Sequence, residues 1–143
     1  MWRTSAGAVI VAVMPRAAAR PRPQRSPEPE LSIRIDLDEE DALGPGKVRL
    51  LELVRDLGSI SSAGRAMDMS YRRAWLLIDE LNRTFKEPLV ETQKGGGGGG
   101  GAQLTASGNE VIRLYRAIAA DATQAALDHL QTLRRMRVSG ARR

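Results

Sequence analysis

Hydrophobic and polar residues repeat with two different periods along the middle of the chain. In residues 31–37 every second residue is aliphatic and those between are polar, the pattern of a strand with one buried face. The acidic stretch 38–41 ends this strand. In residues 47–57 the aliphatic positions recur every three or four residues, which predicts a helix bounded by the Gly-Pro-Gly turn at 44–46 and by Gly58.

Two further helices are predicted after Gly58. The hydroxyl residues at 59–62 can cap a short helix, and Ser70 can cap a longer one that runs from Tyr71 to Phe85. One face of the longer helix is apolar, with Ala74, Leu77, Ile78, Leu81 and Phe85. A short helix, a tight turn and a longer helix form the order of a helix-turn-helix.

A hairpin is predicted after this unit. Residues 89–92 and 102–104 read as two strands that flank Lys94 and the seven consecutive glycines 95–101. The glycine run is not a nucleotide-binding loop, because no Gly-Lys-Ser or Gly-Lys-Thr follows it. We interpret the hairpin as a wing.

The longest predicted element follows the wing. Thr105 can cap a helix over residues 106–134, and residues 135–143 form a basic tail. This helix has more apolar positions than packing on its own domain needs, so we expect a dimer seam. The expected seam residues are Val111, Ile112, Tyr115, Ile118, Ala119, Ala122, Ala126, Leu130 and Leu133. The predicted fold is mainly α with a small β-wing: a winged helix-turn-helix at residues 31–105 plus a long C-terminal dimerisation helix.

The first thirty residues differ in composition from the rest. Prolines alternate with arginines after a short apolar run at 6–14, so residues 1–30 are predicted to be a disordered extension or a wrongly assigned start of the chain. The run also resembles the core of a signal peptide, but a DNA-binding body belongs in the cytoplasm. The run is too short to span a membrane.

The net charge of +5 comes from the start of the chain. Five of the 22 Lys and Arg residues lie in residues 1–27, which contain no acid, so the other 17 balance the 17 Asp and Glu. A neutral body can bind DNA only through clustered cations, so local pattern decides the question.

Catalytic and metal-binding residue types are scarce. The chain has no cysteine and one histidine, His129, so thiolate nucleophiles, zinc sites and histidine-relayed triads lack their residues. The carboxylates show no pairing typical of acid and base catalysis. We therefore expect no enzyme, no catalytic or metal-binding residue and no cofactor.

The start of the third helix carries the candidate DNA contacts. Ser70, Tyr71, Arg72 and Arg73 face outward, and arginines can pair with guanine edges or hold phosphates. The alternative is an ordinary three-helix bundle in which both arginines only solubilise the surface and Trp75 belongs to the core.

Several segments together resemble a known family. The segments are Gly-Ser-Ile-Ser-Ser-Ala at 58–63, Ser-Tyr-Arg-Arg-Ala-Trp at 70–75, Leu-Val-Glu-Thr at 89–92, the glycine run and Leu-Thr at 104–105. Over roughly residues 31–120 they resemble the N-terminal domain of ModE-type molybdate-dependent regulators. LysR-type regulators share the opening, the winged fold and the long helix.

The resemblance implies a homodimer joined by the long helix. Each protomer would place the helix from Tyr71 in the major groove of duplex DNA, on an inverted repeat. The implied DNA contacts are Ser61, Ser62, Ser70, Tyr71, Arg72, Arg73, Trp75, Lys94 and Thr105. Full-length members continue into C-terminal molybdate-binding domains, whereas this sequence stops at Arg143, so we expect no sensing domain here.

Two other hypotheses remain open from the sequence. The chain could be a protein-interaction module that heterodimerises through residues 106–133 with a longer regulator and titrates it. Alternatively, molybdate could bind directly at a helix N-terminus near Ser70 or Thr105, where backbone N–H groups are free to bind an anion.

Overall fold

The computed structural model describes residues 3–4, 7–12, 30–93 and 101–138. Three helices form the body of the fold: α1 (Pro45–Leu57), α2 (Ile60–Ala66) and α3 (Tyr71–Thr84). Strands β5 (Val90–Thr92) and β6 (Ala102–Leu104) pair antiparallel and form the wing. Helices α4 (Ala106–Ala125) and α5 (Leu127–Met136) follow. The predicted winged helix-turn-helix, mainly α with a small β-wing, is confirmed.

The core lies between α1, α2, α3 and the base of the wing. Helix α1 supplies most of it, because five of its aliphatic residues are buried, whereas Leu57 at its C-terminal end is exposed. Fully buried side chains from all these elements meet there: Val48, Leu50, Leu51, Val54, Ala63, Ala74, Ile78, Leu81 and Leu89.

The two turns of the helix-turn-helix depend on left-handed backbone. Gly58 ends α1 at φ 71°, and its N–H donates to the carbonyl of Val54, a closure that glycine makes without steric cost. Asp68, between α2 and α3, has φ 58°. Aspartate is one of the few other residues that tolerate this conformation. These turns set the crossing of α2 and α3.

A second sheet corrects the prediction for the N-terminal segment. Strands β1 (Arg3–Thr4), β2 (Gly7–Ala12), β3 (Ser32–Asp36) and β4 (Ala42–Leu43) pair antiparallel in that order. Residues 1–30 were predicted to be a disordered extension or a wrongly assigned start of the chain, and β1 and β2 contradict the disorder for the residues in these two strands. The physical reason is that the β-branched run in β2 suits a strand, and β3 offers it an edge over five residue pairs. The rest of that segment lies outside the described residues.

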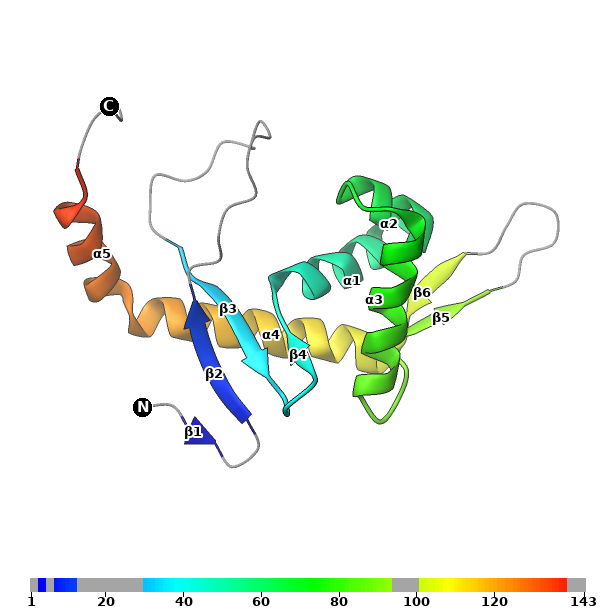
Figure 1. The fold of residues 1–143 in the computed structure, drawn as a ribbon, viewed down its shortest axis with the longest axis horizontal. Coiled ribbons are helices and arrows are strands. Elements are labelled where there is room, and N and C mark those ends of the chain that lie inside the picture. Colours follow the sequence, from blue (N-terminus) through cyan, green and yellow to red (C-terminus); the bar gives the residue numbers. More distant parts are fainter. Residues whose placement is uncertain (1–2, 5–6, 13–29, 94–100, 139–143) are drawn as a thin grey trace.

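The predicted long helix is interrupted. Ala126 leaves helical geometry (φ −96°, ψ 2°), so α4 ends at Ala125 and α5 continues in another direction (Figure 1). Apolar periodicity did not indicate this break, because it preserves the spacing of the stripe. Among the described residues, none buries a side chain of α5.

The first part of α4 packs on its own domain. Ile112 and Tyr115 are buried, and Val111 packs against the core. The prediction of a dimer seam is therefore wrong for Ile112 and Tyr115, whereas partly buried Val111 stays a predicted seam residue. The wing and α1 bury this end of the helix, whereas its far end extends past the three-helix body (Figure 1).

Two polar contacts fix the direction of α4. The Tyr115 hydroxyl donates to the carbonyl of Ile33 in β3 at 2.7 Å. Arg116 binds Glu52 of α1 through two hydrogen bonds of 2.8 and 2.7 Å. Burial raises the pKa of Tyr115, so its hydroxyl stays a donor. Helix α4 is thus held to both the sheet and the three-helix body.

The ion pair of Glu52 should make the free energy of unfolding depend on pH in the acid range. The hydrogen bond from Arg116 lowers the pKa of Glu52 below its ordinary 4.5, although burial opposes the shift. A lowered folded-state pKa contributes stability above the unfolded-state value, and this contribution is lost as pH falls through the folded-state pKa. We expect Glu52→Gln to flatten the decrease in unfolding free energy below pH 4.5 in urea titrations.

Glu110→Gln is the matched control. Glu110 is also paired with an arginine, Arg113, at 2.6 Å, but both side chains are exposed on one helix, where solvent screens the pair. Its replacement should change the acid dependence less. Equal acid dependence in wild type and Glu52→Gln would contradict the assigned role of Glu52.

Candidate nucleic-acid interface

The N-terminal half of α3 exposes aromatic and aliphatic side chains. Tyr71 is 57% exposed and Trp75 37%, and their rings meet edge to face with centroids 6.3 Å apart. Trp75 is therefore not a core residue, which removes one part of the bundle alternative. Leu76, beside it, is 52% exposed.

Two arginines stand on the same surface. Arg72 and Arg73 are exposed, and within the described part of the chain neither has an ion-pair partner. Ser70 caps the helix by accepting a hydrogen bond from the N–H of Arg73 at 3.1 Å. The N-terminal end of a helix dipole adds positive potential here. This end of α3 can therefore receive an anion or an electronegative base edge.

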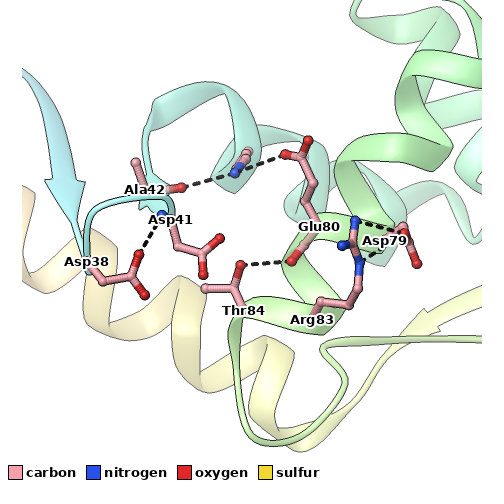
Figure 2. Close-up of polar contacts among 8 residues, drawn as sticks. Asp38, Asp41, Ala42, Asp79, Glu80, Arg83 and Thr84 are labelled. Carbon is pink, nitrogen blue, oxygen red and sulfur yellow. Dashed lines mark hydrogen bonds and ion pairs between the residues drawn. The ribbon is translucent and has the colours of Figure 1, made fainter.

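The C-terminal half of α3 has the opposite character. Asp79 pairs with Arg83 at 3.0 Å, and Glu80 pairs at 3.3 Å with Lys47, whose ammonium also donates to the carbonyl of Ala42 (Figure 2). Arg83 and Lys47 are thus engaged with carboxylates. Only the first half of α3 presents unpaired positive charge.

An acidic loop borders that C-terminal half. Residues 38–41 connect β3 to β4, and the Asp38 carboxylate accepts a hydrogen bond from the N–H of Asp41 (Figure 2). It also accepts one from the N–H of Glu40. These bonds lower the pKa of Asp38, so this carboxylate keeps its negative charge at neutral pH. A polyanion would be repelled from this end of α3 and drawn to the other.

Asn82 attaches the wing to α3, a role that sequence reasoning missed. Its side-chain oxygen accepts from the N–H groups of Leu89 and Val90, at 2.8 and 3.1 Å, and its amide donates to the carbonyl of Val90 at 3.1 Å. The available signal was a polar residue next to the apolar face of the helix. On the other strand of the wing, the N–H of Ala102 donates to the carbonyl of Gly58 at 2.9 Å.

The serines of α2 lie beside the turn between α1 and α2. Ser59 caps α2 by accepting from the N–H of Ser62 at 3.1 Å. Ser61 and Ser62 are partly exposed, and the Ser62 hydroxyl accepts from Arg65 at 3.4 Å. Both hydroxyls remain candidates for phosphate contacts.

Thr105 has a structural role in the fold, and that it also contacts DNA stays a prediction. Its hydroxyl donates to the carbonyl of Pro88 at 2.7 Å and accepts from the N–H of Gly108 at 3.0 Å, so it caps α4 and ties it to β5. The N–H of Gly108, one of the donors at the start of α4, is therefore already bound. Lys94 lies outside the described residues.

Within the described residues, no three His, Cys, Asp or Glu side chains gather as metal ligands would. No buried side-chain nitrogen or oxygen there lacks a hydrogen-bond partner. None of the helices described is long and apolar enough to cross a membrane. The polar surface of α3 is thus the clearest candidate site on the described part of the chain.

Comparison with known proteins identifies this unit. Residues 46–109 match the family model described as bacterial regulatory helix-turn-helix protein, lysR family. The match begins in α1 and ends in the first turn of α4, so it covers the helix-turn-helix and the wing.

Similar proteins carry molybdenum-related names. The chain is 42% identical over 96 residues to the molybdenum transport protein ModE of Azotobacter vinelandii, covering 67% of this chain and 35% of that protein. It is 36% identical over 70 residues to the molybdenum-pterin-binding protein MopA of Rhodobacter capsulatus, covering 49% and 26%. It is also 36% identical over 87 residues to the DNA-binding transcriptional dual regulator ModE of Escherichia coli K12, covering 61% and 33%.

The chain spans about a quarter to a third of the length of these curated relatives. The predicted resemblance to ModE-type and LysR-type regulators is confirmed over the region that carries α1 to α3 and the wing. Residues 46–109 therefore form a helix-turn-helix domain of the lysR family of bacterial regulatory proteins.

Proposed function

We propose that this chain is a sequence-specific DNA-binding transcription regulator that acts as a homodimer on an inverted repeat. The observation that carries the proposal is the charge polarity of α3. Its first half bears exposed, unpaired Arg72 and Arg73, whereas Asp79, Glu80 and the acidic loop border its second half. In helix-turn-helix proteins the N-terminal residues of the recognition helix contact base edges, and this polarity directs the same end into the groove.

The wing supports this mode of binding. Asn82 and the carbonyl of Gly58 hold its two strands in a fixed position relative to α2 and α3. Glu91 and Gln103, paired across the wing, are exposed beyond these attachment points. A rigid wing can contact the DNA backbone beside the groove that α3 enters.

The apolar stripe of α4 and α5 supports a homodimer. Past Tyr115 it extends beyond the three-helix body, and Ile118 and Leu133 are exposed there. A second copy would cover this surface and place two α3 helices on related half-sites. The remaining residues of the predicted seam, Ala119, Ala122, Ala126 and Leu130, are partly exposed along the same helices.

Replacing Ile118 with glutamate tests the dimer. A buried charge in the seam should convert the dimer to a monomer at micromolar concentration, as measured by sedimentation velocity, and should weaken binding to a two-half-site duplex. Ala120→Glu is the matched control, because Ala120 is exposed on the other side of α4. A dimer that persists in Ile118→Glu would contradict the seam.

The genes under control are proposed to be molybdenum-related, because the relatives carry names of molybdenum transport and binding proteins. Selection from a random duplex library at physiological salt, with and without molybdate, tests both parts of the proposal. We expect an inverted repeat to be enriched equally under both conditions. Enrichment only with molybdate would support direct sensing, and no enrichment would overturn the proposed function.

The apolar stripe of α4 and α5 could also pair with the corresponding helix of a longer regulator, which would form a heterodimer. If the chain enriches no duplex alone but co-purifies with a purified full-length ModE-type regulator and reduces its DNA binding, it is a titrating module. Exposed Ile118 and Leu133 are the observation behind this second candidate.

A further inference from the structure

Leu76 occupies the outermost position of α3. Ala74 and Ile78 are buried, and each is two residues from Leu76, about 200° away around a helix that turns about 100° per residue. Leu76 therefore faces away from the core, and its side chain is 52% exposed. Arg72 lies one turn earlier on the same outward ridge.

Leu76 extends the exposed apolar surface of Tyr71 and Trp75 into the charged part of α3. Arg72 and Arg73 precede Leu76, and Asp79 and Arg83 follow it. In this setting a leucine adds nothing to solubility or to phosphate binding. It gains free energy only where it meets an apolar group.

Base edges in the major groove offer one such group. Adenine, guanine and cytosine present hydrogen-bond donors and acceptors there, and thymine adds its C5-methyl group. A leucine placed against a polar edge would remove water from atoms that it cannot bond, at a cost in free energy. Against a thymine methyl, the same leucine buries apolar surface.

We propose that Leu76 is a specificity-determining residue that reads the C5-methyl group of thymine in the half-site. This inference rests on the proposed DNA-binding function and extends it to base preference. Leu76 lies about 6 Å along α3 from Arg72, at about 1.5 Å rise per residue. The thymine should therefore lie within about two base pairs of the Arg72 contact, given about 3.4 Å per step along a DNA strand.

Replacing thymidine with deoxyuridine removes only the methyl group, which gives a sharp test. In the duplex enriched from the library, each thymidine is replaced in turn, and dissociation constants are measured by fluorescence anisotropy for wild type and Leu76→Ala. Wild type should bind about fourfold more weakly at one position per half-site, the effect of one buried methyl-sized group. Leu76→Ala should bind both duplexes equally at that position.

Leu114→Ala is the matched control, because Leu114 is a comparably exposed leucine on α4. Its ratio of affinities for thymidine and deoxyuridine duplexes should equal that of wild type. If Leu76→Ala keeps the wild-type ratio at every position, or if wild type shows no sensitive position, the inference is overturned while the proposed function stands. If the selection with wild type enriches no duplex, the proposed function fails and this inference fails with it.

Discussion

The double variant Arg72→Ala with Arg73→Ala should lose specific binding to the enriched duplex. Each bidentate contact to a base is worth about 1 to 3 kcal/mol, so two should cost about 2 to 6 kcal/mol, at least about thirtyfold in affinity. Both side chains are exposed and unpaired in the described protein, and alanine favours helix, so the fold should not change. Fluorescence anisotropy with specific and scrambled duplexes measures the effect.

The control for this variant removes the same charge elsewhere. Arg49→Ala with Arg113→Ala deletes two exposed arginines from α1 and α4, both paired with glutamates. It should retain most of the preference for the specific duplex, because general charge affects both duplexes alike. If the two double variants lose affinity equally, α3 does not read the operator.

Gly108→Ala should give the largest loss of stability. A Cβ at Gly108 would lie 2.3 Å from the carbonyl oxygen of Leu89. That oxygen already accepts a hydrogen bond from the N–H of Thr105 at 2.9 Å. The backbone at the base of the wing therefore packs directly against the backbone at the start of α4. Overpacking typically costs about 1 to 3 kcal/mol and sometimes more, and a backbone clash belongs at the upper end. Urea unfolding measures the change.

Gly46→Ala in α1 is the matched control. A Cβ there meets nothing within 4 Å, and the residue lies in the first turn of the helix. Reduced freedom of the unfolded chain should stabilise this variant by about 0.4 to 1 kcal/mol. An unfolding free energy for Gly108→Ala within about 0.5 kcal/mol of wild type, the usual range for inconsequential surface changes, would contradict the close approach.

These predictions connect the stability of the fold to its proposed use. Gly108, Thr105 and Asn82 together join the wing to α3 and α4, so a shift at Gly108 should also displace the wing from its position beside α3. Arg72 and Arg73, in contrast, bear on binding alone. Unfolding free energy and DNA affinity should therefore both be measured for the two variants. Gly108→Ala should change both quantities, whereas the double arginine variant should change the affinity alone.

Local pattern predicted most elements of the fold. The alternation at 31–37 predicted β3, and the three- and four-residue apolar spacing predicted α1 and α3. Ser59, Ser70 and Thr105 cap the helices that follow them, as expected. These features depend on neighbours a few residues apart, which a single sequence contains. The outward position of Arg72 and Arg73 follows from the same periodicity.

Long-range contacts decided what the sequence by itself left open or predicted wrongly. Tyr115 has the spacing of a seam residue, but its hydroxyl reaches Ile33 and its ring is buried. Thr105 stands beside the wing as a DNA contact would, and only the structure shows that its hydroxyl binds Pro88 and Gly108. Strand β2 needed the edge of β3, and the break at Ala126 precedes α5, none of whose side chains is buried by the described residues. Periodicity determines which face of an element is apolar, whereas the partner that covers this face is set by residues distant in sequence, and only the tertiary structure brings them together.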